Sequence, residues 1–127
     1  MPVIRLTLQG PIPNKKNLWK IGKGGMYLDS AVKAQIEALT WQAKSQWKRA
    51  PAVHPDMDVE FFVKDGRSDR DNKLGCLLDV LQEAGVLKND NVANFNGTLV
   101  VHPAVIGSKE GVIVDILEKQ NALEIPA

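Results

Sequence analysis

The sequence predicts a single α+β domain in which a mixed β-sheet packs with two main helices. The chain has 127 residues, of which 44% are hydrophobic, enough for one compact core and too few for two ordinary domains. Two long stretches carry apolar residues at helical spacing, and several shorter stretches alternate as strands do. In chain order they give β-(β)-α-β-α-β-β, where the bracketed strand is short. We therefore expect one domain over residues 1–127, with both helices on one face of the sheet.

The first strand is followed by a segment of very different composition. In residues 3–8, VIRLTL, every second residue is isoleucine or leucine, and Gly10 ends the strand. Residues 11–25, PIPNKKNLWKIGKGG, hold two prolines, three glycines and four lysines, which predicts an exposed basic loop. Residues 26–29, MYLD, predict a short return strand.

The first helix is predicted over residues 31–48, and Asp29 or Ser30 can cap its amino terminus. Its apolar stripe recurs at spacings of three and four residues and consists of Val32, Ile36, Leu39, Ala43 and Trp47. Trp41 lies nearly opposite this stripe. A large aromatic residue there indicates that this face is covered as well, either by a second subunit or by a loop folded over Trp41.

The second helix is predicted over residues 72–84 by leucines at positions i, i+3, i+4 and i+7, and Gly85 can end it in a left-handed cap. These leucines are Leu74, Leu77, Leu78 and Leu81. A strand at residues 57–64, MDVEFFVK, precedes the helix, and the residues DGRS turn the chain between them.

The carboxyl-terminal part predicts two further strands. They cover residues 95–103 and 111–118, and the glycine-containing loop between them predicts a hairpin. We expect the tail at residues 118–127 to be disordered.

Charge is distributed unevenly along the chain. Residues 1–50 carry nine Lys or Arg and two acidic residues, a formal charge of +7, and the remainder carries seven basic and thirteen acidic residues, −6. This division can give a basic surface for a polyanion and an acidic centre for cations, or ordinary solvated charge. The lone Cys76, an amino terminus without a signal-peptide pattern and the lack of an apolar run of about 20 residues lead us to expect a reduced, cytoplasmic protein with no membrane contact.

Two aspartates stand at the entrance of the second helix, in the sequence DRDN. One of Asp69 and Asp71 can serve as the helix cap, but two like charges this close repel each other unless a cation or a proton lies between them. Mg²⁺ is commonly held by one or two carboxylates together with water and phosphate oxygens. Asp90 can supply a third oxygen if the chain runs back alongside the helix, about 20 Å long, or if a partner subunit contributes its own Asp90.

These motifs together resemble the RusA-type Holliday-junction resolvases. The matching elements are the DRDN sequence of Asp69, Asp71 and Asn72, the helical Asp79 and Leu81, the turn of Ala84 and Gly85, the pair Asn89 and Asp90, and the amino-terminal LTLQGPIPNKKN. The order of strands and helices agrees from Val3 to about Leu117. The chain departs from the family pattern at Gly75, where the family has a helix lysine, and at Asn89, where it has an acid.

The resemblance implies a small homodimeric endonuclease that cuts four-way DNA junctions with Mg²⁺, in recombination or repair, of a kind common in phages and prophages. Asp69, Asp71 and Asp90 would be the catalytic and metal-binding residues, Mn²⁺ would be able to replace Mg²⁺, and no organic cofactor is implied. Two alternatives stay open. One is a non-catalytic relative that binds branched DNA with a decayed metal site, and the other is a nuclease that prefers flaps or forks.

Several basic and aromatic residues are candidates for DNA contact. The lysines of the loop can meet phosphates and Trp19 can stack on an unpaired base, although Trp19 can equally anchor the loop in the core. The candidates are Lys15, Lys16, Trp19, Lys20, Lys23, Arg67, Arg70 and Lys73, with Asn14, Asn72 and Asp79 in supporting roles. Lys73 is also the nearest substitute for the family lysine that falls on Gly75.

Overall fold

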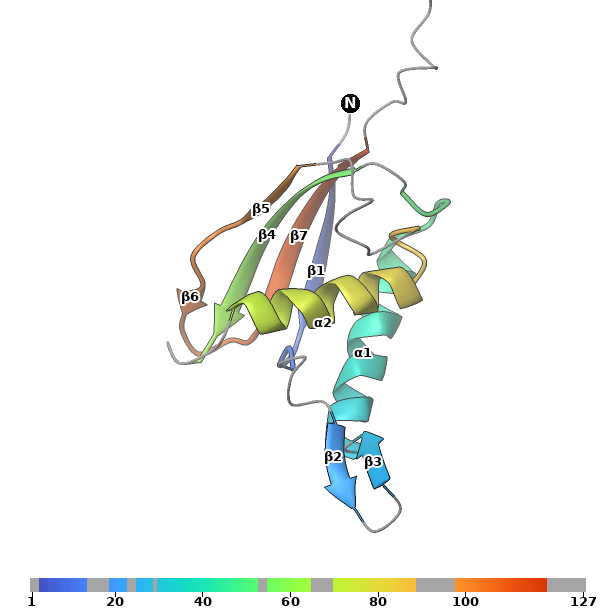
Figure 1. Cartoon of the computed structure of the whole chain (residues 1–127). Coiled ribbons are helices and arrows are strands. Elements are labelled where there is room, and N and C mark those ends of the chain that lie inside the picture. Colours follow the sequence, from blue (N-terminus) through green and yellow to red (C-terminus); the bar gives the residue numbers. More distant parts are fainter. Residues whose placement is uncertain are drawn as a thin grey trace, which may run out of the picture.

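The structure is a computed structural model that describes residues 3–13, 19–22, 25–28, 30–52, 55–64, 70–88 and 98–118, and only the backbone of 19–22, 25–28, 70–72 and 118. Its elements, shown in Figure 1, are β1 (Ile4–Gln9), β2 (Trp19–Gly22), β3 (Gly25–Leu28), α1 (Ser30–Gln46), β4 (Pro55–Val63), α2 (Arg70–Glu83), β5 (Leu99–Val101), β6 (Val105–Ile106) and β7 (Gly111–Glu118). Neither described helix is both long and apolar enough to cross a membrane.

The main sheet has five strands in the order β1-β7-β4-β5, and β6 also pairs with β4. Strand β7 runs antiparallel to both β1 and β4, whereas β5 and β6 run parallel to β4. The sheet is therefore mixed. Both helices contribute to one core against one face of this sheet, and Figure 1 shows α2 lying across that face. The predicted α+β class, a mixed sheet with two main helices, is confirmed.

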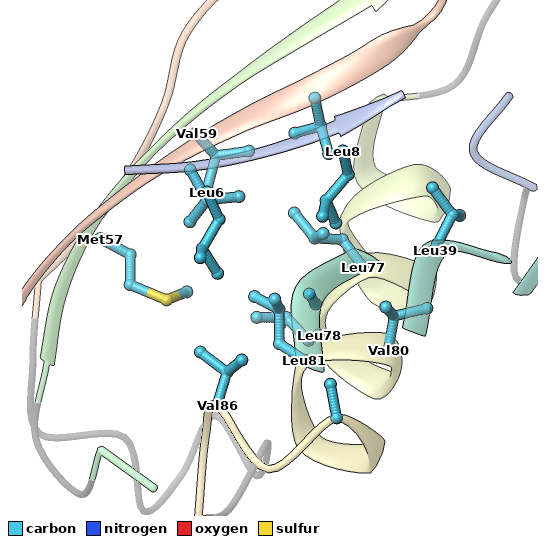
Figure 2. Packing of buried hydrophobic residues seen from close by; sticks show 14 of the residues in the cluster. Leu6, Leu8, Leu39, Met57, Val59, Leu77, Leu78, Val80, Leu81 and Val86 are labelled. Carbon is cyan, nitrogen blue, oxygen red and sulfur yellow. The ribbon is translucent and has the colours of Figure 1, made fainter. Parts of the chain in front are cut away.

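The core follows from the two periodicities in the sequence. Strand β4 alternates buried and half-buried residues over its whole length, so Met57, Val59 and Phe61 face the helices. The leucines of α2 pack against these side chains of β4. Figure 2 shows Leu77 and Leu81, on α2, in the same cluster as the side chains that project from the sheet. In α1 the predicted stripe supplies the buried Leu39 and Ala43, and Trp47 is buried directly after the end of the helix. The stripe of α2 is confirmed, and that of α1 is confirmed from Ile36 onward, whereas Val32 is half-buried and does not belong to the core cluster.

Helix α2 ends as predicted, at Gly85. This glycine has a φ of 80°, in the left-handed region that favours glycine. The Gly85 amide donates to the Gln82 carbonyl (3.1 Å) and the Val86 amide donates to the Leu81 carbonyl (2.9 Å), which is the Schellman arrangement. The chain is thereby turned so that Leu87 bridges to Ala52.

The free edge of β1 is covered by two glutamines of α1. The Thr7 amide donates to Gln46 Oε1 and Gln46 Nε2 donates to the Thr7 carbonyl, both at 2.9 Å. Gln42 makes the same two bonds with Gln9, at 2.7 and 2.9 Å. Because the two glutamines are four residues apart, they lie on one face of α1, and each amide replaces the peptide group of a neighbouring strand.

Two sequence-based expectations about strands are wrong. Residues 11–25 were expected to be a loop, but β2 lies within them and pairs antiparallel with β3 as a separate two-stranded sheet. The density of glycine and lysine in that segment hides a short strand. The hairpin of 95–103 with 111–118 is also absent, because β4 lies between β5 and β7 in the sheet.

The position of β5 has a topological cause. Helix α2 is the crossover between β4 and the next strand, and a helical crossover of this kind joins parallel neighbours. The antiparallel β7 therefore pairs with the other side of β4. The expected loop at 104–110 contains β6, which continues the parallel pairing along β4. The expected disorder of the tail concerns residues beyond Glu118, which lie outside the described part.

We predict that Gly111→Ala destabilises the fold. A Cβ at Gly111 would lie 2.4 Å from the Leu8 carbonyl oxygen, whereas a Cβ at Gly107 would meet no atom within 4 Å. We expect the free energy of unfolding to fall by about 1–3 kcal/mol in Gly111→Ala, measured by urea denaturation. Gly107→Ala is the matched control, and equal stability of the two variants would contradict the close approach of β1 and β7.

Candidate active site

The candidate site lies at the amino-terminal turn of α2. Strand β4 ends at Val63 and α2 begins at Arg70, two residues earlier than the sequence predicted, so the backbone of Asp71 belongs to the first helical turn. Asp69 directly precedes the helix and lies outside the described residues. The side chains of Arg70, Asp71 and Asn72 are likewise outside the description.

Lys73 connects this turn to the end of the first strand. Lys73 Nζ donates a hydrogen bond of 2.5 Å to the backbone carbonyl of Ile12, and the Ile12 side chain is buried in the core. A charge-assisted bond to a carbonyl is stronger than a neutral one. The start of α2 is therefore held against the PIP segment at residues 11–13.

This contact brings together two motifs that are far apart in the sequence. The PIPN sequence begins at Pro11 and the DRDN sequence begins at Asp69, and the Lys73–Ile12 bond joins residues 61 positions apart. Asn14, at the end of the first motif, lies outside the described residues. The juxtaposition of residues 11–13 with the first turn of α2 is the main geometric fact about the site.

Asp79 lies farther along the same helix. It follows Asp71 by eight positions, which is about 12 Å along the helix axis. Asp79 is half-buried and lines a groove between α1 and α2. It is therefore remote along the helix from the turn that carries Asp71.

The path toward Asp90 is fixed over its first residues. After Gly85, the Ala52 amide donates to the Val86 carbonyl (2.8 Å) and the Lys88 amide donates to the Ala52 carbonyl (3.0 Å). Asp90 follows two residues later and lies outside the described part, as does Asn89. Whether Asp90 reaches its own helix start or that of a partner stays a prediction.

Most candidate DNA contacts also fall outside the described residues. These are Lys15, Lys16, Lys23 and Arg67, and for Trp19 and Lys20 only the backbone of β2 is described. Figure 1 shows the β2–β3 hairpin beyond the amino-terminal end of α1, away from the main sheet. Of the candidates, Trp19 and Lys20 belong to β2 of this hairpin. The contacts of all the candidates with DNA stay predictions.

Comparison with known proteins supports the motif-based resemblance. The chain is 33% identical over 116 residues to the crossover junction endodeoxyribonuclease RusA of Aquifex aeolicus (strain VF5), and the alignment covers 87% of each protein. The chain belongs to the RusA family. No protein-family model matches it.

The sheet face opposite the helices of this RusA-family chain carries paired charges. Arg5 donates to both carboxylate oxygens of Asp115, at 2.7 and 2.9 Å. The hydrogen bond from Arg5 lowers the pKa of Asp115, and the pKa of Arg5 is raised in turn. The next residue in the same cross-strand row is Asp58, which lies 2.6 Å from His102 Nε2. The hydrogen bond to Asp58 raises the pKa of His102.

Part of the acidic excess of the carboxyl-terminal half is therefore placed away from the start of α2. Among the described residues, no three His, Cys, Asp or Glu side chains are grouped so that they could hold a metal ion. The side chains of the predicted ligands Asp69, Asp71 and Asp90 lie outside the described residues.

Sequence reasoning missed two features of the site. The carbonyl of Ile12 as the acceptor for Lys73 had no local signal, because nothing in the sequence links residues so far apart. For the groove beside Asp79, the sequence signal was the position of Trp41 opposite the apolar stripe. The charged residues of the groove, Lys33, Lys44 and Glu83, were not predicted to have a role.

We predict that Lys73→Met weakens the attachment of α2 to the PIP segment. Loss of a charge-assisted donor to the Ile12 carbonyl should lower the free energy of unfolding by about 1–3 kcal/mol, measured by urea denaturation. Lys88→Met, which removes an exposed lysine after the same helix, is the control. If both variants are equally stable, the Lys73–Ile12 bond does not hold the helix start.

We predict that the His102–Asp58 pair stabilises the fold mainly at low pH. Because the folded-state pKa of His102 is raised above the ordinary histidine value of 6.5, the stabilisation is complete below that value and is lost as the pH rises through the raised pKa. The difference in Tm between the wild type and His102→Gln should be larger at about pH 5.5 than at about pH 9. A pH-independent difference would contradict the charged pair.

Proposed function

We propose that the protein is a metal-dependent, structure-specific endodeoxyribonuclease that resolves four-way DNA junctions by paired nicks. The observation that carries the proposal is the juxtaposition of the PIP segment with the first turn of α2 through Lys73 and Ile12. It brings together the two motif regions on which the resemblance rests, within a chain that matches a crossover junction endodeoxyribonuclease over 87% of its length. DNA recombination or repair is the setting that this activity implies.

The proposed metal ligands are Asp69, Asp71 and Asp90. Their hard oxygen atoms suit Mg²⁺, with Mn²⁺ as a substitute. Asp69 and Asp71 flank the start of α2, where the free N–H groups of the first turn and the Lys73 ammonium offset part of their mutual repulsion. A bound Mg²⁺ supplies Lewis-acid polarisation of the scissile phosphate and a more acidic water. Hydrolysis of a phosphodiester moves no electrons to a carrier, so no organic cofactor enters the proposal.

The other residues of the chain would bind and position the DNA. Arg67 and Arg70 stand beside the aspartates and would contact the phosphates next to the cut. Lys73 would keep the helix start in place through Ile12. The phosphate backbone of the flanking DNA would be bound by the lysines of residues 11–25, which are Lys15, Lys16, Lys20 and Lys23. Trp19 would stack on an unpaired base. Asn14 and Asn72 would support this arrangement beside the aspartates, and Asp79 could act on it only through the helix, because it lies farther along α2.

The proposed working unit is a homodimer. A four-way junction has approximate twofold symmetry, and two active sites related by a twofold axis can cut opposed strands together. Recognition would then rest on junction shape and backbone contacts rather than on base sequence. The distance between the two sites would have to match the distance between the two cut phosphates.

We predict that Asp71→Asn abolishes nicking of a labelled four-way junction while junction binding persists. Loss of a carboxylate ligand should lower the Mg²⁺-dependent nicking rate by at least about 100-fold, relative to the wild type and to reactions with EDTA. Asp58→Asn is the control, because it removes a carboxylate from the opposite face of the sheet and should leave nicking intact. Linear duplex of the same sequence tests structure specificity.

Each other outcome selects one of the rival functions. Nicking that survives in Asp71→Asn removes the proposed metal site. Tight junction binding by the wild type without any nicking indicates the non-catalytic relative, and the first residue to restore would be a lysine at Gly75. Faster cutting of flaps or forks than of junctions indicates the other nuclease.

A further inference from the structure

A groove of about 800 Å³ lies between α1 and α2. All of its lining residues belong to the two helices. Its apolar part consists of Ile36 on α1 and of Cys76 and Val80 on α2, and the last two are buried members of the core. The groove thus opens directly onto the contact between the helices and is separate from the first turn of α2.

Trp41 stands on the wall of this groove and is 68% exposed. It is the most exposed of the large hydrophobic residues that the structure describes. The alternative, a loop of the same chain folded over Trp41, concerns segments outside the described residues and is not tested by this exposure. A tryptophan beside an apolar groove is the arrangement of a contact residue, since buried aromatic anchors dominate protein interfaces.

The charges along the groove differ between its two walls. Lys33 and Lys44 line the α1 side, together with Glu37, whereas Asp79 and Glu83 line the α2 side. A twofold axis that places α1 of one copy over α2 of the other brings the lysines toward the partner's acids, and does so twice. Placing α1 on the partner's α1 would instead bring lysines toward lysines, which disfavours association.

We propose that two copies of this chain associate through the α1–α2 groove, with Trp41 of each copy inserted into the groove of the other. The self-complementary charge pattern and the adjacent apolar floor identify a second copy as the occupant. The proposal rests on the homodimer of the proposed function and deepens it by naming the surface. It also gives α2 two tasks, since the active site lies at its amino-terminal turn and the interface lies near Val80 and Glu83.

The first test is the dimer dissociation constant of the full-length protein by sedimentation equilibrium. We expect a dimer at micromolar concentration and a dissociation constant raised at least about tenfold in Trp41→Ala. Ile106→Ala is the matched control, because Ile106 is 62% exposed on β6, outside the groove, and its removal should leave the constant unchanged. Circular dichroism of each variant verifies folding.

The second test uses the charge pattern. Lys33→Glu with Lys44→Glu puts acids on both walls, and Glu83→Lys adds a base to the α2 wall, so each protein alone should dimerise more weakly than the wild type. Mixed in equal amounts, they should form a heterodimer, because both α1–α2 contacts then pair opposite charges again. If mixing restores no association, α1 does not lie on the partner's α2.

The remaining outcomes separate this interface from the proposed function. A wild type that stays monomeric, or a dimer that Trp41→Ala leaves intact, overturns the interface, even if junction nicking is normal. A wild-type dimer weakened by Trp41→Ala supports the interface even if no DNA is cut. Where nicking occurs, a cruciform plasmid should be linearised by the wild-type dimer and only nicked by monomeric Trp41→Ala.

Discussion

The packing of the α2 leucines against β4 is the constraint on which the other features depend. Leu77 and Leu81 are completely buried against the alternating inner residues of β4, so the helix can neither roll nor slide without exposing them. Its first turn is thereby held beside Ile12, and its last turns are held beside α1. Because the candidate active site lies at the first turn of α2 and the groove lies beside its later turns, the same apolar contact sets the positions of both.

The two faces of the sheet serve different purposes. The inner face and the helices on it form the core and the candidate site, whereas the outer face keeps its charges in pairs such as Arg5 with Asp115. Exposed pairs of this kind contribute little stability. They do reduce the net field of that face, so the electrostatic character of the protein toward a polyanion depends on the basic amino-terminal part.

Local periodicity was enough to predict the elements whose burial is local. Strand β4 and the leucine stripe of α2 were recognisable because burial repeats every second residue in a strand and every three to four residues in a helix. The pairing partner of β5 could not be predicted from local periodicity. Whether β5 pairs with β4 or with β7 depends on how α2 crosses the sheet. For the site, the motifs located the start of α2, but the bond from Lys73 to Ile12 joins distant parts of the chain and leaves no local trace.

The glutamines on α1 have a consequence for how the protein can meet other molecules. Gln42 and Gln46 already occupy the backbone groups of Thr7 and Gln9 that an incoming strand would need, so this part of β1 is not available as a template for sheet growth. Within the part of the chain that the structure describes, the opposite edge consists of the short β5 and β6. The described main sheet is therefore poorly suited to recognise extended peptides by strand addition or to stack into fibres.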